Sequence, residues 1–121
     1  MPRSRAAIAL TIAASFMLVL AFTQVASAAV VVKATANQTF SPHKLRVHHG
    51  TKVVWKNPSS DSLTHTVTAY SSNWSKNATI HPGHSTSFTF NNTGRYKYRC
   101  TIHSTLSGGV CSGMCGIVKV T

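Results

Sequence analysis

The chain has 121 residues, which is enough for one small domain and not for two. Its 12 Lys and Arg residues against a single acidic residue give a formal net charge of +11, so the protein is strongly basic. The lone acid, Asp61, leaves no pair of carboxylates for acid–base chemistry, which argues against an enzyme.

The N-terminal segment has the pattern of a secretory signal peptide. Two arginines precede an apolar run over residues 6–26, and the Ala-Ser-Ala sequence at 26–28 fits the small-residue rule for cleavage. We therefore expect residues 1–28 to be a signal peptide and residues 29–121 to be one exported domain, whether periplasmic, extracellular or tethered on the outer side of a membrane. Because the apolar run approaches the roughly 18 residues that span a bilayer, an uncleaved anchor stays an alternative.

The positive charge predicts the kind of partner that the exported domain meets. A basic protein encounters acidic surfaces faster, so we expect partners with acidic docking surfaces. Association with anionic membrane surfaces is the other reading of the charge. Nucleic acid is a poor fit, because the lysines and arginines are scattered along predicted strands instead of clustered.

The exported part has the pattern of short strands separated by turns. The predicted strands are residues 30–33, 44–48, 51–56, 65–70, 85–90, 95–100 and 116–121. Several of them alternate with a period of two, which indicates strands with one buried face. Residues 71–82 are polar and are predicted to form a loop, and residues 91–94 a hairpin turn. Short strands without an amphipathic helix indicate an all-β sandwich.

The last quarter of the chain carries side chains that bind soft metals. Cys100, His103 and Met114 supply a thiolate, an imidazole and a thioether. These are three of the four ligands of a site that holds copper as both Cu(I) and Cu(II). The second imidazole must come from elsewhere, and the sequence offers His65 within LTHTVTAY, at the start of a predicted strand.

These residues belong to motifs that resemble a known family. YRCTIH and the terminal GMCGIVKV are similar to the closing motif of the cupredoxins, small blue copper proteins of the plastocyanin, amicyanin and rusticyanin kind. FSPHKLRVHHGTKVVWKN and HPGHSTSFTFNNTGRYKYRC resemble the family's opening strands and its run into the copper cysteine, so the resemblance spans residues 33–120. It implies an antiparallel Greek-key sandwich and one copper ion bound by His65, Cys100, His103 and Met114. It also implies a monomeric one-electron carrier that serves redox protein partners.

Two positions depart from the family's pattern. The family usually has Asn directly after its first ligand His, where it ties the two ligand loops together by hydrogen bonds. Here Thr66 stands in that place, and its hydroxyl can do part of the work. Residues 104–113 separate His103 from Met114, where the family has only a few residues. Met114 keeps the family's Met-x-Gly spacing to Gly116 and is therefore the expected axial ligand.

Two further histidines are assigned a structural role. His81 and His84 flank a Pro-Gly pair in a predicted turn. The resemblance implies that this turn lies at the end of the barrel away from the metal.

The two remaining cysteines leave alternatives open. Cys111 and Cys115 are predicted to form a disulfide across a turn at Gly113, with free thiols as the alternative. A turn is required because an extended strand would hold their Cα atoms roughly 13 Å apart, against the roughly 4.4–6.8 Å of a disulfide. A second class of protein is a secreted β-sandwich with a structural zinc site made of Cys100, His103, Cys111 and Cys115. A metal-free binding module is the third.

Overall fold

The computed structural model describes residues 2, 9, 11–22 and 28–121. Within the predicted signal peptide, residues 1, 3–8, 10 and 23–27 lie outside the described residues, and these include Ala26 and Ser27 of the cleavage motif. Residues 11–22 form neither helix nor strand, and their side chains are exposed. Among the described parts of the chain, no helix has the length and apolar character needed to cross a membrane.

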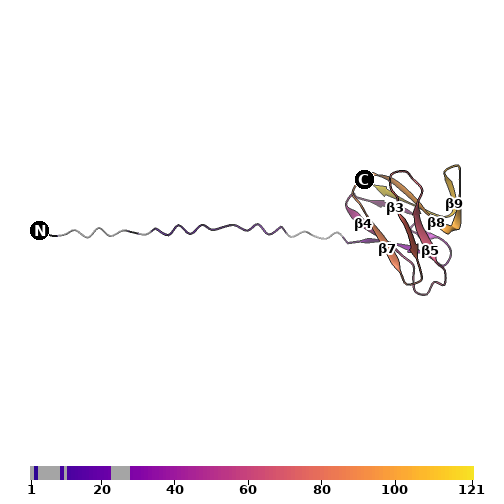
Figure 1. Ribbon diagram of the computed structural model, residues 1–121, viewed down its shortest axis with the longest axis horizontal. Coiled ribbons are helices and arrows are strands. Elements are labelled where there is room, and N and C mark those ends of the chain that lie inside the picture. Colours follow the sequence, from indigo (N-terminus) through magenta and orange to yellow (C-terminus); the bar gives the residue numbers. More distant parts are fainter. Residues whose placement is uncertain (1, 3–8, 10, 23–27) are drawn as a thin grey trace.

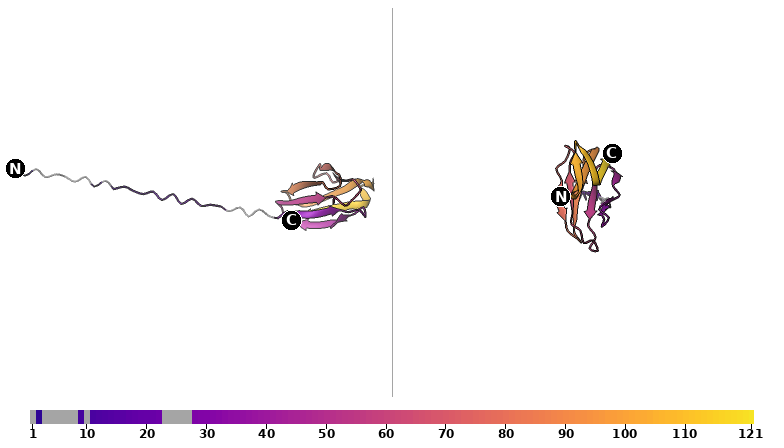
Figure 2. Two further views of the ribbon diagram at one scale, coloured as in Figure 1. Left: turned by 90° about the horizontal axis from the view of Figure 1, so that it is seen from below. Right: turned by 90° about the vertical axis from the view of Figure 1, so that its right-hand side faces the viewer.

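Within residues 28–121, nine strands form two sheets that pack face to face (Figure 1 and Figure 2). In chain order they are β1 (Val30–Ala34), β2 (Phe40–Ser41), β3 (Lys44–Val47), β4 (Thr51–Lys56), β5 (His65–Ala69), β6 (Asn77–Ile80), β7 (Ser85–Phe90), β8 (Gly94–Ser107) and β9 (Val110–Val120). One sheet has the order β2-β1-β4-β7 and the other β3-β9-β8-β5-β6. The predicted all-β sandwich is confirmed. Both sheets are nevertheless mixed, because β1 pairs in parallel with β4 and β3 with β9, where the resemblance implied antiparallel pairing.

The core lies between the sheets and is rich in aromatic rings. Alternate residues of β8, among them Tyr96, Tyr98 and Cys100, are buried while their neighbours face outward. Trp55 is fully buried and packs edge-to-face against Tyr98 and Phe90, with ring centroids 5.3 and 6.4 Å apart. Such aromatic pairs add to the free energy of burial and hold the two sheets in a fixed relation. The strands and loops at the ends of the sandwich are therefore carried on a rigid scaffold.

Two of the predicted connections are wrong. Residues 77–80, expected in a loop, form β6, which pairs with β5 at the edge of the second sheet. Residues 91–94 do not close a hairpin, because β7 belongs to one sheet and β8 to the other. The segment is a crossover from sheet to sheet, and it places Phe90 and Tyr96 in the same core with their ring centroids 4.8 Å apart.

The residues inserted between the expected second and last ligands also form strands. Ser104 pairs with Gly113, and the register continues to Ser107 opposite Val110. The Gly108–Gly109 pair makes the turn, and both φ angles are positive, at 55° and 76°, as a type I′ hairpin turn requires. The insertion is thus an extension of the β8–β9 hairpin that projects from the body of the domain in Figure 1. The additional residues between His103 and Met114 therefore form this two-stranded extension instead of an irregular loop.

Candidate metal centre

Three of the predicted ligands come together in one cluster, which we name the candidate metal centre. His65, Cys100 and His103 each offer a ligand atom, and these atoms all lie within 4.8 Å of one another. His65 begins β5, whereas Cys100 and His103 belong to β8. The two imidazole rings have centroids 5.1 Å apart, and the Cys100 Sγ lies 3.5 Å from the His103 Nδ1. Two strands that are distant in sequence therefore supply one thiol and two imidazoles to a single point.

His65 presents one ring nitrogen that is suited to a metal ion. The side chain is fully buried, and its Nε2 lies 2.8 Å from the Asp61 carboxylate. A carboxylate only accepts hydrogen bonds, so Nε2 carries the proton and Nδ1 keeps its lone pair. The Nδ1 atom is buried and has no hydrogen-bond partner. An orphaned buried nitrogen is costly unless it binds something, so these residues fit a metal ion held at Nδ1.

Asp61 is held in place from several sides. Its carboxylate accepts a hydrogen bond from the Leu63 backbone N–H at 2.8 Å, and its own N–H donates to the Pro58 carbonyl at 3.0 Å. Burial raises the pKa of the Asp61 carboxyl, but the hydrogen bonds from Leu63 and His65 and the electrostatic attraction of the nearby His65 and His103 rings outweigh it, and the net pKa is lowered. Asp61 therefore stays ionised and orients His65, as a carboxylate does for many metal-binding imidazoles.

Sequence reasoning treated Asp61 only as a lone acid and missed this role. One signal was available: Asp61 precedes His65 by four residues and is the only acidic residue in the chain. The spacing alone was insufficient, because the intervening loop has no regular structure that would fix the direction of either side chain.

Cys100 is a buried free thiol tied to the neighbouring ligand strand. The Thr66 backbone N–H donates to the Cys100 Sγ at 3.3 Å. The Thr66 Oγ1 accepts a hydrogen bond from the Thr101 N–H at 2.8 Å. A single residue thus links the strand of His65 to the residue after Cys100, and the expectation that the Thr66 hydroxyl does part of the work of the family's Asn is confirmed.

Met114 is fully buried on β9, between Gly113 and Cys115. These two neighbours pair with Ser104 and Arg99 of β8, and the register is irregular between Arg99 and Ser104. Met114 therefore lies opposite the stretch of β8 that carries the thiol and the second imidazole. Its role as axial ligand stays a prediction that this position favours.

A disulfide bends β9 beside Met114. It joins Cys111 to Cys115, whose Cα atoms are 6.2 Å apart, where a straight strand would separate them by roughly 13 Å. Gly113 allows the bend, because its φ is +100° and a Cβ at this position would lie 2.5 Å from the His103 carbonyl oxygen. The predicted disulfide is confirmed, and it closes a short loop around Met114.

The same disulfide overturns the alternative zinc site. That site required reduced Cys111 and Cys115 beside Cys100 and His103. Because the first two sulfurs are bonded to each other, only one of the four expected ligands is a free thiol. A structural site of three thiolates and one imidazole therefore has no basis in this fold.

The expected position of the His81 turn is also wrong. The His81 Nδ1 lies 3.2 Å from the Thr64 Oγ1, and Ile80 pairs with His65. The turn therefore lies at the same end of the sandwich as the candidate metal centre. His81 and His84 are exposed, with ring centroids 6.1 Å apart. The expectation rested on the family resemblance, whereas the pairing of β6 with β5 brings the turn directly after Ile80 to the end where His65 lies.

A two-sheet sandwich with a His–Cys–His cluster that could hold a metal ion defines a small all-β domain. The sequence profile of the family described as the cupredoxin-like domain matches residues 9–111. The chain therefore belongs to the cupredoxin-like family. The matched range includes His65, Cys100 and His103 and ends before Met114. No protein with a curated description matches the chain.

Solved structures share the fold. The reduced state of an amicyanin mutant is 27% identical with a TM-score of 0.64, over 81% of this chain and 87% of that one. The Cu(I) form of another amicyanin mutant is 26% identical with a TM-score of 0.60 and the same coverage. A purple cupredoxin from Nitrosopumilus maritimus is 24% identical with a TM-score of 0.58, over 76% of this chain and 99% of that one. At this identity the last similarity is one of fold alone.

Proposed function

We propose that this protein is a mononuclear copper electron carrier, with one ion held by His65, Cys100, His103 and Met114. The observation that carries the proposal is the convergence of two imidazoles and one free thiol, whose ligand atoms lie within 4.8 Å of one another. The orphaned Nδ1 of His65 supports it. Two imidazoles and a thiolate with a distant thioether are the ligand set of redox copper. Similar structures include the Cu(I) form of an amicyanin.

Copper bound by such a set supplies one-electron chemistry between Cu(I) and Cu(II). The chain's own residues keep the ligands fixed: Asp61 orients His65, and the Thr66 N–H bonds to the Cys100 sulfur. Because these groups are buried in a rigid sandwich, the ligands need to move little when the charge changes. His103 is partly exposed, whereas His65 and Cys100 are fully buried. We therefore assign His103 as the ligand through which electrons pass to and from solvent-side partners.

We assign no enzymatic reaction. The only side-chain carboxylate is engaged with His65, so no other acidic side chain is left to act as a general acid or base. The fold is also found within a copper-containing nitrite reductase from Thermus scotoductus, 22% identical with a TM-score of 0.59, but only 22% of that chain is covered. This similarity is one of fold and transfers no activity.

The setting that we propose is outside the cytoplasm. Disulfides persist in oxidising compartments, so the Cys111–Cys115 bond supports export of residues 29–121 after removal of the predicted signal peptide. The net positive charge supports acidic redox proteins as partners. We propose that the carrier works as a monomer.

The visible spectrum of the protein with added Cu(II) tests the proposal. We expect one equivalent of Cu(II) to give an intense charge-transfer band that Cys100→Ser abolishes and His103→Ala alters. His81→Ala is the matched control, because it removes an exposed imidazole at the same end of the domain and should leave the band unchanged. A folded protein that stays colourless with Cu(II) would refute the proposal, and one that binds no metal would support the binding module considered from the sequence.

A further inference from the structure

Basic side chains gather on the outer face of one sheet. Burial alternates along β3, β8 and β9, so the residues between the buried ones point away from the core. On these three neighbouring strands the outward positions hold six cations, which we name the basic face: Lys44, Arg46, Arg95, Lys97, Arg99 and Lys119. In the sequence these residues are scattered, and the strand pairing brings them together.

The register places cations directly beside one another. Arg46 pairs with Lys119, which pairs with Arg95, so three positive side chains stand abreast across three strands. Like charges in opposed positions destabilise a sheet. No acidic side chain offsets them, because the only one, Asp61, is buried at the candidate metal centre. The face is therefore suited to an anionic surface that would relieve this repulsion.

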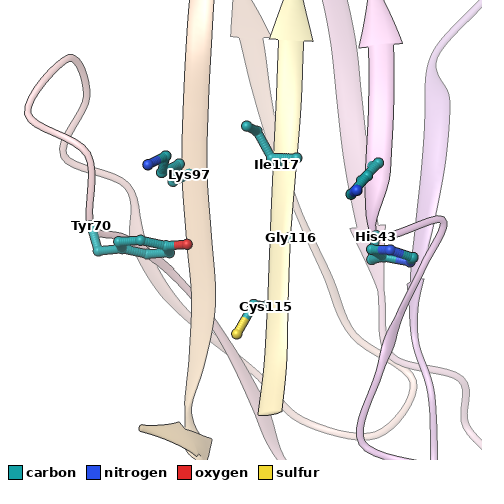
Figure 3. Close-up of a pocket in the computed structure, with 7 residues that line it drawn as sticks. His43, Tyr70, Lys97, Cys115, Gly116 and Ile117 are labelled. Carbon is teal, nitrogen blue, oxygen red and sulfur yellow. The ribbon is translucent and has the colours of Figure 1, made fainter. Parts of the chain in front are cut away.

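A hollow of about 180 Å³ opens within the basic face (Figure 3). Two residues along β9 from Lys119, Ile117 is paired with Lys44 on one side and with Lys97 on the other. Figure 3 shows Tyr70 and Lys97 on one side of Ile117 and His43 on the other. The floor of the hollow is apolar and its rim carries positive charge and a phenol. These features fit the methylene stem and carboxylate of an Asp or Glu side chain.

The basic face reaches the candidate metal centre along β8. Arg99, at the end of the face, directly precedes Cys100. Lys97 is three residues from Cys100, which is roughly 10 Å along a strand. The Arg99 guanidinium also donates to the Ser104 hydroxyl at 3.1 Å, next to His103. A partner seated on the face is therefore joined to the thiol and the second imidazole by a short run of one strand.

We propose that the basic face is the docking surface for an acidic protein that exchanges electrons with the metal centre, an inference that rests on the proposed function. The occupant is a protein surface and not a lipid surface. Within residues 28–121, the large exposed apolar side chains that can enter a bilayer lie elsewhere, at Val31, Ile102, Leu106 and Val110. The face instead has a small apolar centre ringed by charge, which is the layout of a protein–protein interface.

Two pairs of charge reversals test the docking surface. Lys44→Glu with Lys97→Glu changes the basic face. Lys33→Glu with Lys56→Glu makes the same change in net charge at two exposed, directly paired positions on the other sheet. The probes are cytochrome b5, a small acidic haem protein, and vesicles of phosphatidylserine and phosphatidylcholine. Each is titrated into ¹⁵N-labelled protein, both metal-free and copper-loaded.

We expect cytochrome b5 to shift amide signals in β3, β8 and β9, with binding that weakens as salt is added. The basic-face pair should weaken this binding by at least about ten-fold and the control pair by less than about three-fold. Equal weakening by both pairs would show that net charge alone acts and would overturn the proposal. Tighter binding of vesicles, lost in the basic-face pair, would assign the face to a membrane and overturn it too.

Folding and function are separated by further measurements. No variant should unfold at a lower temperature than the parent protein, and Arg46→Gln with Arg95→Gln tests the same face without reversing charge. If metal-free protein binds cytochrome b5 through the basic face but takes up no redox-active copper, the proposed function fails and the docking surface stands. If the copper protein undergoes one-electron reduction but neither basic-face variant affects binding, the docking surface alone is refuted.

Discussion

Replacing Asp61 with Asn should weaken Cu(II) binding without unfolding the domain. The amide can still accept a hydrogen bond from the His65 Nε2, now at 2.8 Å from the carboxylate, but the negative charge is lost. Hydrogen bonds to charged groups contribute about 1.5–3 kcal/mol and neutral ones about 0.5–1.5 kcal/mol. The difference is about 1–1.5 kcal/mol. Loss of a residue that supports a metal ligand typically lowers metal affinity by about 10–100-fold, and because the amide keeps a weaker hydrogen bond we expect the lower end of this range, about ten-fold or about 1.4 kcal/mol.

The loss of affinity should be larger for Cu(II) than for Cu(I). A carboxylate makes the imidazole a stronger electron-pair donor to the metal, and the more highly charged ion gains more from this. If all of the loss falls on Cu(II), the reduction potential rises by about 60 mV for one electron. The assays are competition with a Cu(II) chelator and a spectroscopic redox titration. Asn57→Ala is the control, because Asn57 holds the same loop through the Leu63 and Ile80 carbonyls but carries no charge. A change in potential below about 10 mV in Asp61→Asn, or an equal one in Asn57→Ala, would refute the reasoning.

Three further predictions concern stability. Burial raises the pKa of Tyr98 to about 12 from 10.0, so its contribution to stability is complete below pH 10 and is lost as pH rises toward 12, by about 3 kcal/mol. Urea unfolding across this range should show the loss, and Tyr98→Phe should flatten it; an unchanged slope would contradict the assignment. Gly113→Ala should lower the free energy of unfolding by more than Gly50→Ala, because both positions have positive φ but only the alanine methyl at position 113 would meet the His103 carbonyl oxygen. Equal losses of stability in the two variants would show that contact with the His103 carbonyl is not the cause. Thr66→Val keeps the side-chain shape but leaves the Thr101 N–H without its acceptor, so unfolding experiments should show a loss of about 1–2 kcal/mol. A variant as stable as the parent would mean that the hydroxyl does not tie the two strands.

The parts of the fold that the sequence predicted are those with a local signal. Alternation along residues 95–100 indicates a strand whose inward face holds Tyr96, Tyr98 and Cys100, and all three are buried. The Cys-x-x-His spacing keeps Cys100 and His103 close in the chain, but a regular strand would hold them roughly 10 Å apart on opposite faces. The irregular register between Arg99 and Ser104 is what brings the Cys100 Sγ to 3.5 Å from the His103 Nδ1. His65 required the family resemblance, because nothing local says which histidine of a distant strand faces the thiol.

The connections could not be predicted, because pairing partners decide them. Residues 91–94 have the composition of a hairpin turn, yet they join two sheets. β6 has only four residues, and its pairing with β5 decides its conformation more than its own composition does. For the same reason the sequence did not predict that the cations of the basic face lie close together, because their proximity depends on the registers of β3, β8 and β9.

The placement of the single acid links the two proposals. With Asp61 and the Cys100 thiolate both ionised, the proposed centre holds two negative charges, which balance Cu(II) and exceed Cu(I) by one. In a buried site this balance favours the oxidised ion. Placing the only carboxylate there leaves every charged side chain on the surface positive. The position of Asp61 therefore stabilises the oxidised form of the metal centre, and the absence of other acidic side chains leaves a positive surface that favours an acidic partner. An acidic partner on the basic face should in turn favour the more positive, oxidised form of the domain, so binding should be tighter to that form.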